Sequence, residues 1–122
     1  MTTNVIASRM YNLYHTNKYR QAFKELYDTN ILSVLYSGQT QTITNGKFNL
    51  LEKLKEFKKQ VDVIHNHKIF EPIVNNNHFI LAMEVDVTMK GKKRKKVKEI
   101  GVYEVKNGKI VKEEFFSSMA YN

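Results

Sequence analysis

A chain of 122 residues without cysteine has no disulfides, no thiolate nucleophile and no cysteine-ligated zinc. The hydrophobic fraction of 42%, with seven Phe and seven Tyr residues, excludes a disordered chain and supplies a core for one domain over residues 1–122. The formal net charge of +8 favours anionic partners. Because the sequence shows neither a signal peptide nor an apolar run of membrane-spanning length, we expect a cytoplasmic protein without a membrane partner.

Three helices and one short strand are predicted in the N-terminal half. Apolar side chains recur at helical spacing over residues 5–16 and 19–27, and residues 28–30 form a predicted break. Branched and aromatic side chains predict a short strand over residues 31–36. A third helix is predicted over residues 47–59. Its narrow apolar stripe consists of Phe48, Leu51, Leu54 and Phe57.

The C-terminal half predicts four long antiparallel strands. They cover residues 61–70, 79–89, 97–105 and 110–118. In the second of these, every other residue from Phe79 to Met89 is apolar, and the opposite face carries Glu84, Asp86 and Thr88, which is typical of a strand with one buried face. Asn107-Gly108 predicts a tight hairpin between the last two strands, because these residues adopt positive φ angles readily. Helices followed by strands indicate an α+β fold with the helices on one face of the sheet.

Two segments carry a resemblance to a known family. The stretch IGVYEVKNGKIVKEEFFSS (residues 100–118) resembles the closing hairpin of SnoaL-like proteins in the nuclear transport factor 2-like superfamily. The stretch NHFILAMEVDVTMKGKKR (residues 77–94) resembles the preceding strand pair, and Gly46 matches the usual entry to the third helix. The resemblance implies a cystatin-like cone, with three N-terminal helices packed on a curved, mostly antiparallel sheet. It also implies a pocket inside the cone and a homodimer through the outer sheet face.

The resemblance does not extend to the activity of ketosteroid isomerases, which share this fold. Those enzymes use a tyrosine on the first helix, a general-base aspartate on the first strand and a second acid on the penultimate strand. A match without gaps places Tyr11 at the tyrosine position, but Leu35 and Gly101 stand where the two acids are needed. Steroid isomerisation is therefore not expected, and Tyr11 is either a pocket residue or a core residue.

Two glutamates are the candidate catalytic residues. The same match places Glu99 and Tyr103 on the pocket face of one strand, and Glu113, Phe115 and Ser117 on the pocket face of the next. Neighbouring carboxyls in an apolar pocket would raise one pKa and provide an acid or base near neutrality. The alternative is that one or both glutamates lie at the open rim, solvated or paired with a lysine.

The remaining pocket candidates are aromatic, sulfur-containing or imidazole side chains. They are Tyr11, Tyr14, His65, His67, Met83, Tyr103 and Phe115. His65 and His67 stand two apart on one predicted strand face, where they either line the pocket, lie on a polar face or form half of a metal site. A His-x-His pair alone is a weak metal signal, so we expect neither a metal nor a cofactor.

Residues 90–98 contain seven basic residues in nine. Such a segment can grip phosphates, but it contains no aromatic side chain for base stacking. It is interpreted as a solvated hairpin, and nucleic acid is not the expected partner. Glu84 and Asp86 lie opposite the apolar face of their strand, where they can pair with lysines on the outer sheet face.

Two functions follow from the sequence. The first is a SnoaL-like protein that binds an unknown small, largely apolar molecule, with acid/base chemistry of isomerase, lyase or cyclase type at Glu99 or Glu113. The second is a non-catalytic dimeric interaction or scaffold domain, whose basic hairpin contacts an anionic partner.

Overall fold

The helices form where helical spacing predicts them. The computed structural model describes residues 1–118. The helices are α1 (Thr3–His15), α2 (Tyr19–Leu26) and α3 (Lys47–Gln60). The Thr2 hydroxyl accepts a hydrogen bond from the Val5 backbone N–H and so caps α1. In α3 the predicted stripe is wrong at Phe48, which is 73% exposed, because the helix buries Leu50 instead.

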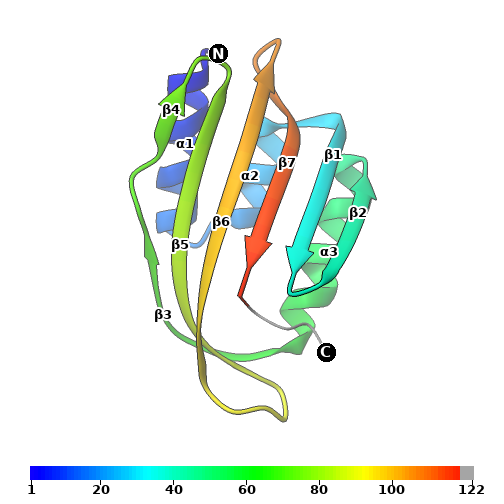
Figure 1. Ribbon diagram of the computed structural model, residues 1–122, viewed down its shortest axis with the longest axis vertical. Coiled ribbons are helices and arrows are strands. Elements are labelled where there is room, and N and C mark those ends of the chain that lie inside the picture. The colour runs from blue at the N-terminus through cyan, green and yellow to red at the C-terminus, as the bar shows by residue number, and fades with distance from the viewer. Residues whose placement is uncertain (119–122) are drawn as a thin grey trace.

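Within residues 1–118, seven strands form one mixed sheet. They are β1 (Tyr27–Ser37), β2 (Thr40–Asn45), β3 (Val61–Ile69), β4 (Ile73–Asn75), β5 (His78–Met89), β6 (Lys95–Lys106) and β7 (Lys109–Ser117). The order is β2-β1-β7-β6-β5-β3, with β4 paired to β5 (Figure 1). β1 and β7 run parallel, whereas the other neighbours are antiparallel. The predicted α+β class with a mostly antiparallel sheet is confirmed.

The first strand differs from its prediction. β1 is longer than predicted and takes in residues 28–30, which the sequence indicates as a break. At the predicted break, the pairing of β1 with β7 is irregular. Tyr27 pairs with Ile110 and Leu32 pairs with Lys112, so a longer segment of β1 lies opposite a shorter segment of β7. β2, which is mostly exposed, has no counterpart in the prediction.

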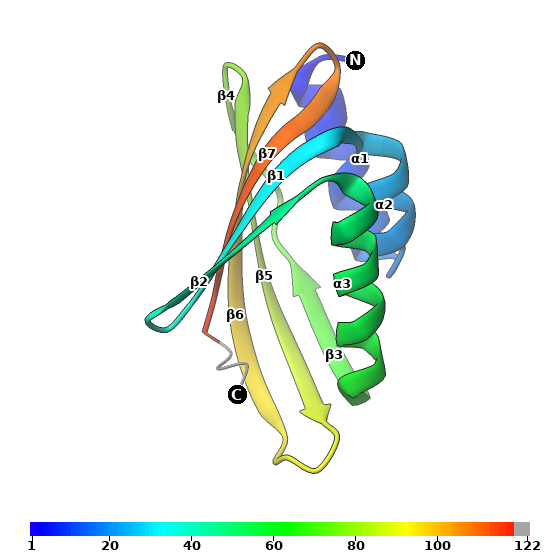
Figure 2. The ribbon, with the colours of Figure 1, turned by 90° about the vertical axis from the view of Figure 1, so that its right-hand side faces the viewer.

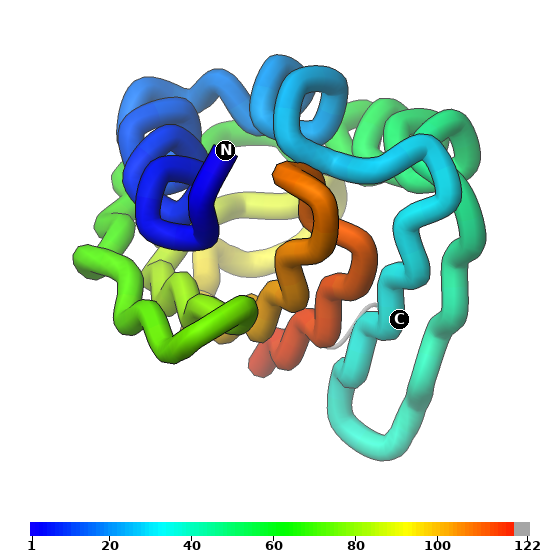
Figure 3. Tube along the Cα trace, turned by 90° about the horizontal axis from the view of Figure 1, so that it is seen from above, coloured from blue at the N-terminus to red at the C-terminus, as the bar shows by residue number. Residues whose placement is uncertain are grey.

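The helices cover the concave face of a curved sheet (Figures 2 and 3). α1 packs against β3, β4 and β5, whereas α3 contacts β1, β2 and β3. Since β2 and β3 are the two edges of the main sheet path, α3 bridges edges that the curvature brings toward each other. The core lies between these layers. Among residues 1–118, no helix has the length and apolar character needed to cross a membrane.

The closing hairpin sets the register of the last two strands. Asn107 and Gly108 have φ angles of 51° and 74°, and Lys106 pairs with Lys109 across the turn. Alternate residues of β7 point into the cone only beyond an irregularity between the Val105–Ile110 and Glu104–Lys112 pairs, which shifts the alternation and turns Glu113 inward. On β5 the predicted apolar face is buried, with Phe79, Leu81 and Met83 at most 4% exposed. Asp86 on the opposite face forms a two-pronged ion pair with Arg94, at 2.7 and 2.9 Å.

Candidate functional site

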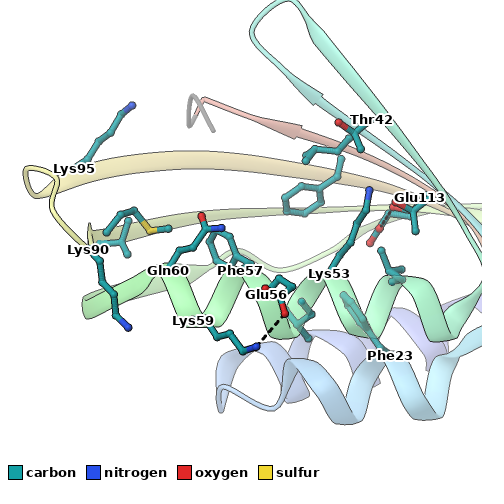
Figure 4. A pocket seen from close by; sticks show the side chains of 18 of the residues that line it. Phe23, Thr42, Lys53, Glu56, Phe57, Lys59, Gln60, Lys90, Lys95 and Glu113 are labelled. Atoms are coloured by element: carbon teal, nitrogen blue, oxygen red, sulfur yellow. Dashed lines mark hydrogen bonds and ion pairs between the residues drawn. The ribbon is translucent and has the colours of Figure 1, made fainter. Parts of the chain in front are cut away.

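A cavity of about 790 Å³ lies between α3 and the concave face of the sheet (Figure 4). Its apolar lining consists of Phe23, Leu35, Leu50, Leu54, Phe57, Val87, Met89 and Phe115. In Figure 4, Glu113 lies near Phe23 at one end of the cavity, and Lys90 and Lys95 lie at the other. Phe23 and Glu113 are buried, whereas residues 90–96 are exposed, so the lysine end is the open end.

Glu113 provides the buried carboxyl at the closed end. It lies on an inward-facing position of β7, directly opposite Ser33 of β1 and Tyr103 of β6. The Ser33 hydroxyl donates a hydrogen bond to Oε2 at 2.6 Å, and the Tyr27 hydroxyl donates to Oε1. Glu113 is only 5% exposed. The two hydroxyls fix the orientation of the carboxyl while its side chain still lines the cavity.

Burial determines how Glu113 titrates. Removal from water raises the pKa of the Glu113 carboxyl, and this effect outweighs the hydrogen bonds from Ser33 and Tyr27, which lower it. A carboxyl with a raised pKa keeps its proton to higher pH, and its ionised form is a stronger base than an ordinary glutamate.

Three tyrosines surround this carboxyl. Burial raises the pKa of Tyr14, Tyr27 and Tyr103 well above the ordinary value, and the charge of Glu113 contributes in each case. All three phenols therefore remain protonated and can donate hydrogen bonds. Tyr14 lines the cavity, and Tyr27 is bound to Glu113. The Tyr103 hydroxyl is buried without a hydrogen-bond partner among residues 1–118.

Gly101 is required by the position of the Tyr103 ring. A Cβ atom on Gly101 would lie 2.2 Å from the Tyr103 hydroxyl oxygen and 2.5 Å from Cζ. The ring folds back over its own strand at this point, and only glycine leaves the space. The residue at the position where an isomerase would carry its second acid thus has a packing role.

The model of the SnoaL-like domain family matches residues 1–117. The chain belongs to this family. A solved structure of a proposed SnoaL-like polyketide cyclase from Mesorhizobium loti is 29% identical, with a TM-score of 0.88 over 94% of this chain and 98% of that one. None of the curated proteins matches the chain.

More distant structures share the nuclear transport factor 2-like fold of this SnoaL-like protein. A protein of unknown function with a cystatin-like fold from Xanthomonas campestris is 15% identical, with a TM-score of 0.76 over 98% of this chain and 92% of that one. An NTF2-like protein of unknown function from Burkholderia pseudomallei is also 15% identical, with a TM-score of 0.74 and coverage of 94% and 90%.

The cavity brings together three of the residues proposed from the sequence. Tyr14, Glu113 and Phe115 line it. Tyr103 and Met83 belong to the adjoining core. Tyr11 is half-buried on the next turn of α1 and stacks on His15, with ring centroids 5.7 Å apart.

The structure does not bring Glu99 beside Glu113. Glu99 lies opposite Ser117, and Glu113 lies opposite Tyr103. The Gly101–Phe115 pair stands between them, so the two carboxyl-bearing positions are about 13 Å apart along the strands at about 3.3 Å per residue. Burial, and not a neighbouring carboxylate, is what raises the pKa of Glu113.

The two strand histidines lie on opposite faces, contrary to the prediction. An irregularity in the pairing of β3 with β5 falls between Ile64 and Asn66, and it breaks the two-residue alternation. His65 Nε2 lies 2.7 Å from the Thr88 hydroxyl, on the face of β5 that carries Asp86. His67 turns toward α1, where its Nε2 donates to the His15 carbonyl at 3.2 Å.

Metal ligands do not converge in the part of the chain that the structure describes. Residues 1–118 contain no group of three His, Cys, Asp or Glu side chains placed to hold a metal ion. His15 and His67 contact edge to face, with ring centroids 6.5 Å apart.

Sequence reasoning missed three residues of the site. Tyr27 was assigned to the end of a helix, but it begins β1. Ser33 had a usable signal, because it is the polar residue between inward-facing Ile31 and Leu35 of the same strand. Lys53 had none, since a lysine on an amphipathic helix is ordinarily solvated.

Proposed function

We propose that this SnoaL-like protein binds a small, largely apolar molecule in the cavity and that Glu113 exchanges a proton with it. The observation that carries the proposal is a buried carboxyl, held by two hydroxyl donors, at the closed end of a cavity that has a large apolar lining. A solved structure described as a proposed isomerase from Rhodopseudomonas palustris, 14% identical with a TM-score of 0.69 over 98% of this chain and 91% of that one, shares the fold.

The chemistry that suits this arrangement is enolisation. Glu113 takes a proton from a carbon next to a carbonyl group, and the electron pair of the C–H bond moves toward the carbonyl oxygen. Tyr14 lines the same cavity and can donate a hydrogen bond to that oxygen. Return of the proton to another carbon would be isomerisation, and attack by the enolate carbon within the ligand would be cyclisation. We assign the proton transfer to Glu113 alone, because Glu99 is not among the cavity-lining residues.

The test follows Glu113 directly. Carbon-13 labelling of the glutamate carboxyls, with Glu113→Gln to assign the signal, gives its titration by NMR. We expect a midpoint above the ordinary range, and a further change when the neutral fluorophore N-phenyl-1-naphthylamine occupies the cavity. A midpoint in the ordinary range would overturn the proton-carrier role. Failure of this probe to bind would count against an apolar ligand site.

We also propose that two copies associate through the outer sheet face. Ile80, Ile100 and Phe116 are 38%, 46% and 42% exposed there, on three adjacent strands. Such a patch supports an interface, since isolated monomers rarely leave contiguous apolar surface open. Analytical ultracentrifugation is expected to show a dimer that Ile100→Lys converts to a monomer. A wild-type chain that remains monomeric at high micromolar concentration would refute the proposal.

A further inference from the structure

The charged residues that line the cavity are unbalanced. Six are lysines and two are glutamates. The lysines are Lys53, Lys59, Lys90, Lys92, Lys93 and Lys95. Glu56 is neutralised by Lys59, whose amine donates a hydrogen bond to it at 3.1 Å. Glu113 is buried at the closed end and has a raised pKa. Within residues 1–118, neither glutamate of the lining therefore balances the positive charge of Lys53, Lys90, Lys93 and Lys95.

Lys53 is the lysine that enters the cavity. Figure 4 shows its side chain extending from α3 toward the sheet, between Phe57 and Glu113. Its amine forms no ion pair and no hydrogen bond within residues 1–118, and the same holds for the amines of Lys90, Lys93 and Lys95. Lys53 is solvent-exposed at the wall of the cavity, and because it has no counter-ion among residues 1–118, its charge is available to an anionic ligand.

The cavity is also elongated. Along β6, eight residues separate Tyr103, which lies opposite Glu113, from Lys95 at the open end. At about 3.3 Å per residue this is about 26 Å. Leu54, Phe57 and Phe115 contribute apolar surface to the wall of the cavity. A ligand that fills this space has a long apolar body and an end that meets the lysines.

We infer that the ligand of the proposed function is an amphiphilic anion, whose carboxylate, sulfonate or phosphate group lies among Lys53 and the lysines of the β5–β6 turn. This inference rests on the proposed cavity function and narrows its ligand class. The apolar body extends along Leu54, Phe57 and Phe115, and the uncharged end approaches Glu113. The lysine-rich turn, for which the sequence predicts a solvated hairpin, is thereby part of the ligand site.

The position of the lysines favours a single amphiphile over nucleic acid. They stand at the mouth of an apolar cavity, whereas single-stranded nucleic acid needs exposed aromatic rings beside the basic groups. Arg94, the residue of the turn best suited to phosphate, is engaged by Asp86 on the outer face. The anionic group of a free amphiphile and the anionic headgroup of a membrane lipid have the same chemistry. The experiment below therefore compares a free amphiphile with lipid vesicles.

The test uses two probes that differ by one charged group. 8-Anilino-1-naphthalenesulfonate and N-phenyl-1-naphthylamine share the same ring system, and only the first carries a sulfonate. We expect the wild-type protein to bind the sulfonate at least tenfold more tightly. Raising the salt concentration from 0.05 to about 0.5 M should remove most of this preference, because it screens exposed charges. Amide chemical-shift changes at Leu54 and Phe115 establish that both probes enter the cavity.

Two variants and a matched control locate the anion site. Lys53→Gln, and separately the triple variant Lys90→Gln/Lys93→Gln/Lys95→Gln, should each weaken sulfonate binding about threefold to tenfold. Binding of the neutral probe should stay unchanged. The control Lys18→Gln/Lys24→Gln/Lys106→Gln removes three exposed charges away from the cavity and should leave both affinities as they are.

The outcomes separate the inference from the proposed function. If neither probe binds, the cavity function itself fails. If both bind equally, or if the control weakens the sulfonate as much as the cavity variants do, the cavity function stands and the anionic ligand class is refuted. Dodecanoate should displace the sulfonate more effectively than 1-dodecanol does. Tighter binding to phosphatidylglycerol vesicles or to a short single-stranded DNA than to dodecanoate would also refute the inference.

Discussion

Glu113→Gln tests the physical basis of the site without reference to any ligand. Glutamine has nearly the same shape and can still accept a hydrogen bond from the Tyr27 hydroxyl, but it carries no charge at any pH. The structure makes Glu113 a buried carboxyl whose pKa lies above the ordinary value of 4.5 because burial dominates over its two hydrogen bonds. The substitution therefore removes the group that makes burial costly at high pH.

The sign of the effect follows from proton binding. Between pH 4.5 and the raised pKa, folded Glu113 keeps a proton that the unfolded chain has released. The free energy of unfolding of the wild type falls as pH rises through this interval, by about 1.4 kcal/mol per pH unit. This contribution of Glu113 is complete below the ordinary pKa and is lost once the pH exceeds the raised value. The Gln variant lacks it at every pH.

Urea unfolding followed by circular dichroism from pH 4 to pH 8 measures the difference between the two proteins. We expect the variant to be less stable than the wild type at pH 4, by about 1 kcal/mol, because the Ser33 hydrogen bond is disturbed. As pH rises, the free energy of unfolding of the variant should increase relative to that of the wild type. Glu114→Gln changes the next carboxyl of β7, on the other face, and serves as the control. A wild type that gains stability over the Gln variant between pH 4.5 and 7 would show that the hydrogen bonds outweigh burial, and would refute our account of Glu113.

Three further substitutions probe the supports of the site. Tyr27→Phe removes a hydrogen-bond donor that lowers the pKa of Glu113. The midpoint of the NMR titration of the Glu113 carboxyl should therefore move to still higher pH. An unchanged midpoint would mean that this hydrogen bond contributes little to the pKa. Gly101→Ala forces a Cβ atom against the buried Tyr103 ring. It should lower the free energy of unfolding in urea by about 1–3 kcal/mol. A decrease below about 0.5 kcal/mol would show that the ring moves aside freely. Gly108→Ala places a side chain at a φ of +74° and should lower the free energy of unfolding by about 1 kcal/mol. The NMR chemical shifts of the cavity residues should stay unchanged. Altered shifts there would argue against an effect confined to the turn.

Local patterns in the sequence predict the last three strands and their turn, but not every side-chain direction along them. Every other residue of β5 from Phe79 to Met89 is apolar, which predicts its buried face, and Asn107-Gly108 predicts the turn that joins β6 to β7. A side-chain period of two would direct Lys112 and Glu114 inward from the turn. A one-residue irregularity between the Val105–Ile110 and Glu104–Lys112 pairs shifts this alternation, so that Glu113 points into the cone instead. The lysine-rich segment was also evident from composition.

Long-range pairing decided the remainder of the site. β1 joins β7 in parallel, and this places Ser33 and Tyr27, 80 and 86 residues away in the chain, on the two oxygens of Glu113. The pairing irregularity in β3 separates His65 from His67, although their spacing implies a shared face. The curvature of the sheet then lets α3 bring Lys53 over the cavity. Alternation along one strand determines which way a side chain points, but which residues it meets depends on strands and helices far away in sequence, whose pairing no local pattern specifies.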